Sequence, residues 1–290
     1  MYFKGTYTAL ITPFRTDQQV DFEILEKLVE RQVKSGVDGI VPVGTTGESP
    51  TLRADEHLKV IERTVQIVAG RCKVIAGTGA NSTSEAVELT LAAKAFGVDG
   101  TLQVTPYYNK PNNNGLVQHF SAIADLGVPV VLYNVPGRTS REIPISVVTE
   151  LSQHANIVSI KEAAGSVDRV SDIIKACNLE VLSGDDVLAV PMIKSGACGV
   201  ISVASNIIPL QVCEMIHFAL NNEFNRAEDV HNTWVKLFDD LFIDTNPIPV
   251  KAAASMLGLV DEIYRLPLCK MNLDLRNQLQ KTMKKLGIIV

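Results

Sequence analysis

Lys161 is the residue whose position best fits a chemical role, because it ends the apolar segment Ile157–Lys161. Lysine is almost never fully buried without a partner, and an apolar surrounding favours its neutral amine, which is a nucleophile. A neutral amine can attack a ketone and form a Schiff base. The alternative is a solvated lysine that ends a strand and pairs with Glu162. On these residues alone the two interpretations have equal weight.

The segment Gly44–Ser49 and the residues Tyr133 and Arg138 supply groups that would assist such an amine. Two glycines bracket two threonines in this segment, so free N–H groups can hold a carboxylate and hydroxyls can transfer protons. Tyr133 is a candidate acid or base, and Arg138 presents a planar guanidinium to a carboxylate. Taken singly, each is better interpreted as a turn, a packed ring or a solvated charge.

Two further loops carry candidate residues. Tyr107 and Tyr108 lie between prolines, where paired tyrosines could anchor an interface or carry protons, or simply pack the loop. Asp185 and Asp186 could bind a metal, but no third carboxylate has a suitable spacing, and a helix cap is the better interpretation. No Cys/His cluster has metal-ligand spacing, so we expect no metal.

All these residues lie at or just after the ends of short apolar segments, which alternate with stretches of helical period. Nearly continuous apolar segments are typical of parallel strands covered on both faces. Eight strand–helix units in about 220 residues predict a (β/α)8 barrel, whose chemistry lies on the loops after the strands. The strands are expected at Thr8–Ile11, Gly39–Val43, Lys73–Ala76, Gly100–Thr105, Val128–Asn134, Ile157–Lys161, Glu180–Ser183 and Gly199–Val203.

The helical stretches complete the expected architecture. Asp55 and Ser82 or Ser84 are predicted N-caps, and we predict a barrel domain at residues 1–224 with a helical region at residues 225–290 packed on it. An open doubly wound sheet is the structural alternative, but no GxGxxG follows the first strand. Four of the expected helices are Phe22–Ser35, Asp55–Ala69, Ser82–Phe96 and Val167–Ala176.

The composition excludes several classes of protein. The chain has 290 residues, 46% of them hydrophobic, and a net charge of −5 without a basic run, so nucleic-acid binding has no electrostatic support. No apolar run approaches the roughly 20 residues that span a bilayer, and the first residues lack a signal-peptide pattern. The five scattered cysteines are typical of reduced thiols. We therefore expect a cytoplasmic protein that binds neither membrane nor nucleic acid.

Seven segments, in this order, resemble the dihydrodipicolinate synthase family, also called the 4-hydroxy-tetrahydrodipicolinate synthases. They are GTTGE (44–48), TPYYNKP (105–111), NVPGRT (134–139), IKEA (160–163), SGDD (183–186), GVISV (199–203) and NPIPVK (246–251). The resemblance runs from about residue 5 to the C-terminus. It implies a cofactor-free lyase that condenses pyruvate with L-aspartate 4-semialdehyde on the diaminopimelate route to lysine, commonly as a homotetramer of tight dimers.

The resemblance also implies the catalytic roles. Lys161 attacks the pyruvate ketone and loses water, and the iminium lets a methyl proton leave, giving an enamine that attacks the aldehyde. The amine of the second substrate then displaces Lys161 and closes the ring. Tyr133 gives and takes protons, and Thr45 relays them between Tyr133 and Tyr108, which comes from the neighbouring subunit.

The implied substrate contacts lie on the same loops. Thr46, with the backbone amides of Thr45 and Thr46, would hold the pyruvate carboxylate, and Ile201 would touch pyruvate through its backbone. Gly184 is a further substrate contact. Arg138 would bind the carboxylate of the semialdehyde.

Many bacterial and plant members of this family have a lysine feedback site at a dimer interface. Ala54 stands where some sensitive members carry His, so the resemblance implies weak to moderate inhibition by L-lysine. The matching positions are Ser49, His57, Asn81, Glu85 and Tyr107.

Three other functions compete with this interpretation. A sister Schiff-base aldolase, such as N-acetylneuraminate lyase or a keto-deoxy sugar acid aldolase, looks similar around the lysine and tyrosine. Sialic acid lyases usually read GSTGE and lack the PGRT arginine, so Thr45 and Arg138 favour the synthase. A non-catalytic keto-acid sensor would have lost Lys161 or Tyr133. A flavin or phosphate-binding barrel would need a Gly-rich loop where the acidic SGDD stands.

Overall fold

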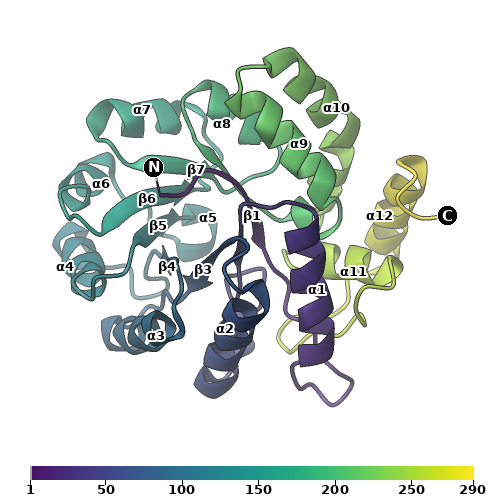
Figure 1. Cartoon of the computed structure of the whole chain (residues 1–290), viewed down its shortest axis with the longest axis horizontal. Helices are drawn as coiled ribbons and strands as arrows, with labels where there is room; N and C mark the ends of the chain where they lie inside the picture. Colours follow the sequence, from purple (N-terminus) through teal and green to yellow (C-terminus); the bar gives the residue numbers. More distant parts are fainter. Residues whose placement is uncertain (1) are drawn as a thin grey trace.

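Eight short strands pair side by side in chain order, and the eighth closes on the first. The result, in the computed structural model of residues 2–290, is a parallel barrel ringed by helices (Figure 1). The predicted (β/α)8 architecture is confirmed. The strands are β1 (Gly5–Ala9), β2 (Gly39–Val41), β3 (Lys73–Gly77), β4 (Gly100–Val104), β5 (Val130–Asn134), β6 (Ile157–Glu162), β7 (Glu180–Ser183) and β8 (Gly199–Ser202).

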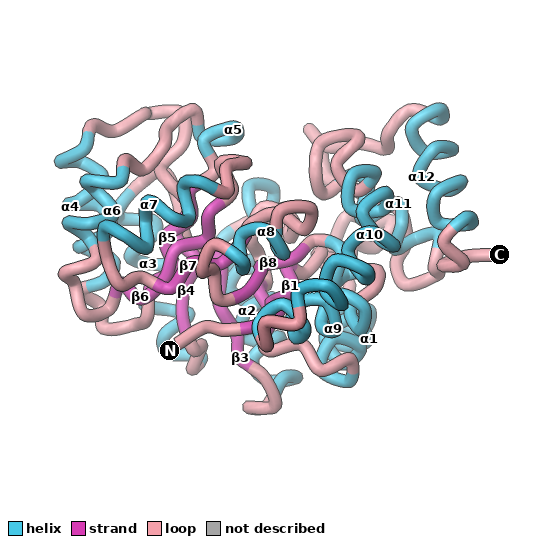
Figure 2. The backbone as a smooth tube through the Cα atoms, turned by 90° about the horizontal axis from the view of Figure 1, so that it is seen from above, coloured by secondary structure: helices cyan, strands magenta, loops and turns pink. Residues whose placement is uncertain are grey.

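Most helices follow the strands in alternation, and those from residue 224 onwards lie to one side of the barrel (Figure 2). The helices are α1 (Phe22–Lys34), α2 (Ala54–Val68), α3 (Thr83–Phe96), α4 (Asn113–Ala124), α5 (Pro136–Thr139), α6 (Ile145–Leu151), α7 (Asp168–Ala176), α8 (Ala189–Lys194), α9 (Pro209–Leu220), α10 (Phe224–Asp240), α11 (Ile248–Met256) and α12 (Leu273–Lys285). Helix α12 packs against α10 and α11, and α10 against α9. The domain division between residues 224 and 225 stays a prediction.

The first strand was placed too late by the sequence pattern, because β1 starts at Gly5 and ends at Ala9. Thr6 and Thr8 are buried in it, although the expected strand began only at Thr8. A buried hydroxyl is tolerated when it is hydrogen-bonded, and Thr8 Oγ1 donates to Gln32 Oε1 at 2.8 Å. The strand therefore does not need to be apolar throughout.

The N-cap predictions have different outcomes. Helix α2 begins at Ala54 with Arg53 as its N-cap, so the prediction of Asp55 was wrong. Glu56 accepts a hydrogen bond from Arg53 N at 3.3 Å, which closes this end of the helix from the third helical position. Ser82 is the N-cap of α3, as predicted, but its hydroxyl bonds Ser84 Oγ at 2.9 Å instead of the helix backbone.

The core has two apolar layers, one inside the barrel and one between the strands and the surrounding helices. The inner layer includes Tyr7, whose ring is accommodated because residue 39 is glycine. A Cβ at Gly39 would lie 2.4 Å from the Tyr7 ring. The inner layer contains Phe3, Tyr7, Ala9, Val41, Ile75, Leu102, Val131, Tyr133, Val135, Val158, Leu182, Cys198 and Ile201.

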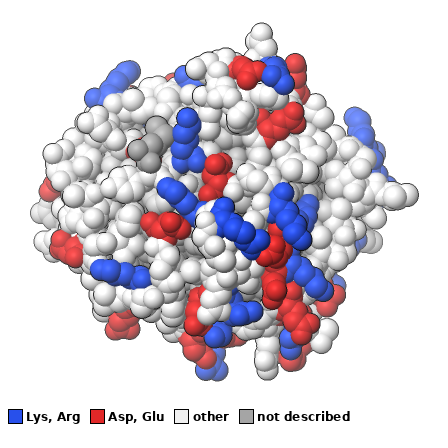
Figure 3. Space-filling model, viewed as in Figure 1, with Lys and Arg blue, Asp and Glu red and all other residues white. Residues whose placement is uncertain are grey.

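The surface carries charges of both signs. Lys and Arg are interspersed with Asp and Glu over the face in Figure 3. Such mixing gives no broad field of one sign on that face to attract a polyanion. Within residues 2–290, no helix combines the length and apolar character needed to cross a bilayer.

His119 on α4 should make the fold sensitive to acid. Its Nδ1 lies 2.9 Å from Thr83 Oγ1, and its ring is 4% exposed. Burial lowers the pKa of His119 from 6.5 to about 4. The unfolded chain therefore binds a proton at a higher pH than the folded chain. The contribution of His119 to the free energy of unfolding is complete above pH 6.5 and is lost as the pH falls towards 4, by about 3 kcal/mol.

We expect His119→Gln to flatten this dependence. Urea unfolding at several pH values between 7 and 4 would give the slope for each variant. His217, which is exposed on α9, provides a matched control, and His217→Gln should keep the wild-type slope. Equal slopes for wild type and His119→Gln would contradict the prediction.

Candidate active site

Lys161 and Tyr133 lie side by side on β6 and β5, where they are register partners. The Lys161 Nζ is 4.3 Å from the centroid of the Tyr133 ring. Both side chains are buried, with exposed fractions of 5% and 7%. Strand β6 continues for one residue beyond Lys161, to Glu162, so Lys161 does not end the strand as predicted. The pair nevertheless lies at the carboxyl end of the barrel, where barrel enzymes place their chemistry.

A slip in strand pairing turns Lys161 into the barrel. The register between β5 and β6 shifts by one residue after Val130. Val158 belongs to the inner layer, so strict alternation would send Ile160 inward and Lys161 outward. Instead Ile160 packs in the outer layer, and Lys161 reaches Tyr133. An extra residue in one strand re-aims the side chains beyond it.

Glu162 points away from Lys161 and forms a separate buried network. Its carboxylate accepts hydrogen bonds from Asn134 Nδ2 at 2.9 Å, from Arg169 Nε at 2.8 Å and from the Ala164 amide at 2.8 Å. The interpretation that Glu162 pairs with Lys161 is therefore wrong. Because Asn134 follows Tyr133 directly, this network fixes the ends of both strands that carry the amine and the phenol.

The loop Gly44–Ser49 closes over one side of the mouth. Thr46 is buried, and its Oγ1 accepts a hydrogen bond from Asn246 Nδ2 at 3.0 Å. Thr45 is half-buried and lines a small cavity of about 30 Å³ together with Tyr133 and Ser49. That volume is enough for about one water molecule. The loop thus brings Thr45 to the same cavity as Tyr133.

Asn246 joins two predicted binding residues, although sequence reasoning did not single it out. Its carbonyl accepts a hydrogen bond from Arg138 Nη2 at 2.9 Å, while its side chain holds Thr46. Asn246 is 6% exposed, and its Oδ1 has no hydrogen-bond partner among the described residues. The only signal in the sequence was its place at the start of NPIPVK. Arg138 itself is exposed on α5, and its Nη2 is held by the Asn246 carbonyl.

Gly184 gives Lys161 the room that it needs. A Cβ at position 184 would lie 3.0 Å from Lys161 Cε and 2.6 Å from Ala163 Cβ. Its amide donates to the Glu162 carbonyl at 2.8 Å, which fixes the start of this loop. Ile201 is fully buried in the inner layer on β8. Gly184 therefore follows β7 beside Lys161, and Ile201 lies inside the barrel; their contact with a substrate stays a prediction.

The two aspartates of SGDD have structural partners. Asp185 Oδ1 accepts hydrogen bonds from the amides of Val187 at 2.9 Å and Leu188 at 3.4 Å, just before α8 begins. Asp186 is fully buried, and burial raises its pKa. Its Oδ2 accepts hydrogen bonds from the Val203 and Ala204 amides, both at 2.9 Å. Asp185 thus holds the turn before α8, while Asp186 holds the end of β8.

Tyr108 stands apart from Lys161 within this chain. Its side chain is 91% exposed. Its φ of 72° is costly for a bulky residue, and such strain is concentrated at functional sites. A hydrogen bond from the Asn109 amide to the Tyr107 carbonyl, at 2.9 Å, closes the tight turn around it. The chain therefore holds Tyr108 outward instead of packing it against its own barrel.

The five residues predicted for lysine feedback surround the loop between β3 and α3. His57 Nε2 lies 2.7 Å from the Gly77 carbonyl, and Asn81 Nδ2 donates to the Tyr107 carbonyl at 3.3 Å. Burial and the nearby Glu85 carboxylate raise the pKa of Tyr107. Ser49 lines the small cavity of Thr45 and Tyr133. A ligand among these residues would therefore adjoin the cavity that Thr45 and Tyr133 line.

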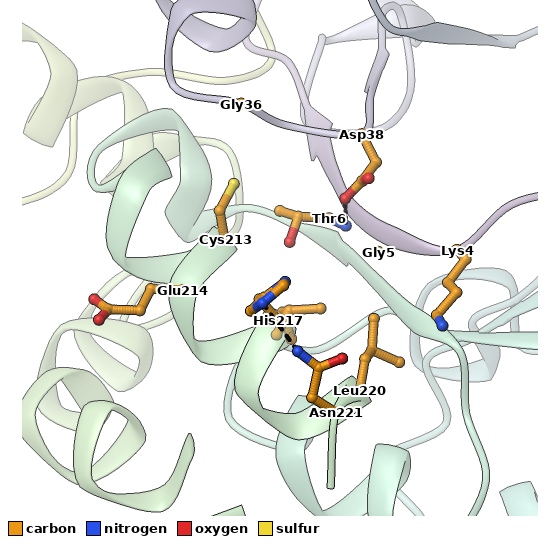
Figure 4. Close-up of a pocket in the computed structure, with 11 residues that line it drawn as sticks. Lys4, Gly5, Thr6, Gly36, Asp38, Cys213, Glu214, His217, Leu220 and Asn221 are labelled. Carbon is orange, nitrogen blue, oxygen red and sulfur yellow. Dashed lines mark hydrogen bonds between the residues drawn. The ribbon is translucent and has the colours of Figure 1, made fainter. Parts of the chain in front are cut away.

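A larger cavity lies at the opposite end of the barrel from Lys161. It has a volume of about 620 Å³ and opens between the start of β1, the segment before β2 and α9 (Figure 4). Its lining carries both signs of charge, with Lys4, Asp38 and Glu214. Asp38 Oδ2 already accepts a hydrogen bond from the Thr6 amide at 2.8 Å. None of the predicted catalytic residues lines this cavity, so it is not the candidate active site.

Comparisons with known proteins agree with the geometry. A sequence model described as the dihydrodipicolinate synthetase family matches residues 2–286. The 4-hydroxy-tetrahydrodipicolinate synthase of Aquifex aeolicus (strain VF5) is 49% identical over 290 residues, which cover 99% of this chain and 98% of that protein. The crystal structure of dihydrodipicolinate synthase from Aquifex aeolicus is similar with a TM-score of 0.98 at 48% identity, covering 99% of each chain.

Two further similar structures contain small molecules. The dihydrodipicolinate synthase from Acinetobacter baumannii, complexed with pyruvate, has a TM-score of 0.97 at 44% identity. The enzyme from Cyanidioschyzon merolae, with lysine bound, has a TM-score of 0.96 at 39% identity. In both comparisons 99% of each chain is covered.

Proposed function

This chain belongs to the dihydrodipicolinate synthetase family, and we propose that Lys161 is the amine on which its reaction takes place. The reaction is that of the 4-hydroxy-tetrahydrodipicolinate synthases: pyruvate condenses with L-aspartate 4-semialdehyde to give 4-hydroxy-tetrahydrodipicolinate, in lysine and diaminopimelate biosynthesis. The observation that carries the assignment of Lys161 is its buried amine, 4.3 Å from the centroid of the Tyr133 ring at the mouth of the barrel.

Each step follows from groups around this amine. The neutral amine of Lys161 adds to the pyruvate ketone, and water leaves as the iminium forms. The iminium accepts the electron pair released when a methyl proton leaves, and the resulting enamine carbon attacks the aldehyde. The amine of the second substrate then replaces Lys161 as the ring closes. Tyr133 moves the protons, and Thr45 on the shared cavity connects it to further donors.

The carboxylates of the two substrates are assigned to the two residues that Asn246 contacts, Thr46 and Arg138. The pyruvate carboxylate is held by Thr46 and the amides of Thr45 and Thr46, with Ile201 and Gly184 bounding the space beside Lys161. The semialdehyde carboxylate is bound by Arg138, which is exposed at the mouth. Asn246 supports this arrangement because it bonds both Thr46 and Arg138.

The test of the reaction is a direct choice between substrates. Purified protein should consume pyruvate and L-aspartate 4-semialdehyde and should not cleave N-acetylneuraminate or a keto-deoxy sugar acid. The sister aldolases resemble this chain around the lysine and the tyrosine, so pyruvate binding alone does not separate them. Cleavage of a sugar acid without condensation of the semialdehyde would refute the proposal.

Arg138→Lys is expected to weaken binding of the semialdehyde without affecting pyruvate. Lysine keeps the charge but loses the planar fork that bonds a carboxylate at two points. Because a charge-assisted hydrogen bond contributes about 1.5–3 kcal/mol, the KM for the semialdehyde should rise about 10- to 100-fold. Steady-state kinetics with each substrate varied would measure it. An unchanged KM for the semialdehyde, or an equal rise for pyruvate, would place the second carboxylate elsewhere.

We propose that Tyr108 completes the active site of a neighbouring subunit in a homotetramer. The support is its 91% exposure together with its strained, outward-held backbone. A large aromatic side chain is costly to expose and is a common anchor in interfaces. Delivered across a dimer interface, the phenol would extend the proton path from Tyr133 through Thr45.

L-Lysine is expected to inhibit weakly to moderately, at millimolar concentrations, through Ser49, His57, Asn81, Glu85 and Tyr107. Glu85 is exposed beside Tyr107 and offers the carboxylate that an amino group requires. Glu85→Gln should therefore raise the half-inhibitory concentration of lysine by about tenfold or more, since hydrogen bonds to charged groups contribute about 1.5–3 kcal/mol. Dose–response curves would show it.

Glu88 is the matched control for this experiment, because it is an exposed carboxylate on the same helix, α3. Glu88→Gln should leave the half-inhibitory concentration of lysine equal to that of the wild type. No change in activity of the wild type at millimolar lysine would eliminate the regulatory proposal while leaving the catalytic one intact.

A cytoplasmic location is proposed from the thiols. All five cysteines are free, and burial raises the pKa of Cys198 to about 12 and those of Cys72 and Cys213 to about 11. Thiols with such a pKa are protonated and unreactive at neutral pH. Several unpaired cysteines are typical of proteins in reducing compartments.

A further inference from the structure

A buried ion pair joins the loop 44–48 to the C-terminal helices. Lys251 Nζ, on α11, contacts Glu48 Oε1, and both side chains have an exposed fraction of 0%. The two residues are 203 positions apart in the sequence. Glu48 is the last residue of GTTGE and Lys251 the last residue of NPIPVK. This pair is separate from Lys161 and plays no part in the covalent steps.

The surroundings of the pair are aromatic and closed. Lys251 Nζ lies 4.1 Å from the centroid of the Phe14 ring and 5.5 Å from that of Tyr264. The other carboxylate oxygen of Glu48 accepts a hydrogen bond from the Arg265 amide at 3.3 Å. The Arg265 guanidinium sits 4.5 Å from the Phe14 ring centroid and bonds the Thr51 carbonyl at 2.9 Å. Both the carboxylate and the amine are thus held from several elements.

Such a pair is a poor source of stability. Removing two charges from water costs as much as their attraction returns, so apolar replacements of buried pairs are often neutral or stabilising. Burial lowers the pKa of Lys251 to about 8, although Glu48 acts in the opposite direction. The ammonium is therefore costly to bury even beside its partner. The best-attested benefit of a buried pair is that it fixes one arrangement of the chain.

The arrangement that this pair fixes is the strained loop that shares a cavity with Tyr133. Val43 and Glu48 stand at its two ends with φ values of 49° and 56°, in the left-handed region that side chains rarely adopt. Strain of this kind persists only where the surroundings over-determine the backbone. The Gly47 carbonyl accepts from Thr12 Oγ1 at 2.6 Å, and Thr46 is held by Asn246. Asn246 and Lys251 belong to one segment, which therefore contacts the loop at two residues, Thr46 and Glu48.

We propose that Lys251 and Glu48 are positioning residues that align the Thr45 and Thr46 amides for the carboxylate of the keto acid. The proposal rests on the function proposed above, because it assigns the pyruvate carboxylate to this loop. The pair does not touch the substrate. It acts through Glu48, whose left-handed backbone directs the preceding amides towards the mouth. The C-terminal helices are then required for keto-acid affinity and not only for covering the barrel.

The test is trapping of pyruvate on the full-length protein with borohydride, as a function of pyruvate concentration. The double variant Glu48→Gln/Lys251→Met removes both charges at nearly constant volume, so it should fold. Its half-saturating pyruvate concentration should rise about 10- to 100-fold, because small misplacements of a binding group have effects of that size. The fraction trapped at saturating pyruvate should equal that of wild type, since Lys161 is untouched.

A matched control separates positioning from stability. Asp240 is another fully buried carboxylate, bonded to Lys236 at 2.6 Å and Thr282 at 2.6 Å within the C-terminal helices. Asp240→Asn should lower the melting temperature without moving the half-saturating pyruvate concentration. A rise in that concentration in both variants would show a general effect of loosening the helices and would overturn the proposal.

The remaining outcomes are also decisive. A folded double variant with the wild-type half-saturation would overturn the positioning role and leave the proposed function standing. Absence of trapping in the wild type would refute both. If the double variant fails to fold, Glu48→Gln alone serves with the same readout. The lowered pKa of Lys251 allows its amine to become neutral when the carboxylate is removed, and the same rise in half-saturation is expected.

Discussion

Lys161→Met should abolish condensation, lowering kcat by about 10³-fold or more, and should leave no pyruvate adduct after borohydride reduction. A covalent mechanism has no bypass when its nucleophile is removed, and losses of that order or larger follow from such changes in other enzymes. The only other lysine that is fully buried, among the residues described, is Lys251, which is engaged with Glu48. Among the described residues, no other buried lysine is therefore unpaired and able to replace Lys161.

Mass spectrometry of the reduced protein would measure the adduct, and peptide mapping would locate it. Lys175→Met is the control, because Lys175 is exposed on α7. This substitution also removes one positive charge, but from the surface. It should keep wild-type turnover and a full adduct. A pyruvate adduct of normal yield on Lys161→Met would mean that another amine carries the reaction.

The position of Lys161 was predictable from the sequence, but its direction was not. An apolar segment ending in lysine is visible in the pattern of residues 157–161, and the parallel barrel places that end at the mouth. Whether the side chain points inward depends on the register slip after Val130. Simple alternation from Val158 gives the wrong face, and no local preference in the sequence reveals such a slip.

The contacts that complete the site were beyond sequence reasoning because they are long-range. Asn246 bonds Thr46 across 200 positions of the chain, and the ion pair of Glu48 joins it to α11. The two prolines of NPIPVK are unfavourable inside a helix, but they do not indicate which residues the segment contacts. The fold brings the loop after β2 beside the segment before α11, as the hydrogen bond between Asn246 and Thr46 shows. The resemblance to the family identified the motif without giving its physical partner.

The first strand shows another limit of prediction from the sequence, because polar residues concealed where it begins. Its residues Thr6 and Thr8 are not apolar, so hydrophobicity placed the strand later than β1 begins. The burial of Thr8 is possible because Gln32 on α1 accepts its proton. A polar residue in a strand is thus made acceptable by a partner from a different element, which a window along the sequence does not contain.

Tyr133→Phe should lower kcat by about 10²- to 10⁴-fold, the usual contribution of a positioned acid or base. The ring and its packing against the Lys161 amine remain, so only the hydroxyl is lost. Formation of the Schiff base should be slowed, but trapping should still reach completion at saturating pyruvate after long incubation. Rapid-quench trapping beside steady-state turnover would measure both quantities on one preparation.

Tyr7→Phe is the matched control, since Tyr7 is also buried inside the barrel, on β1. Loss of its hydroxyl should leave kcat within about twofold of wild type. This result is expected because catalysis depends on the proton of Tyr133 and not on other polar groups of the inner layer. The comparison with Lys161→Met then assigns the roles. Removing the nucleophile eliminates the adduct and turnover together, whereas removing the proton donor leaves the adduct and loses turnover. A Tyr133→Phe variant that turns over at the wild-type rate would assign proton transfer to Thr45 or to a residue of the neighbouring subunit.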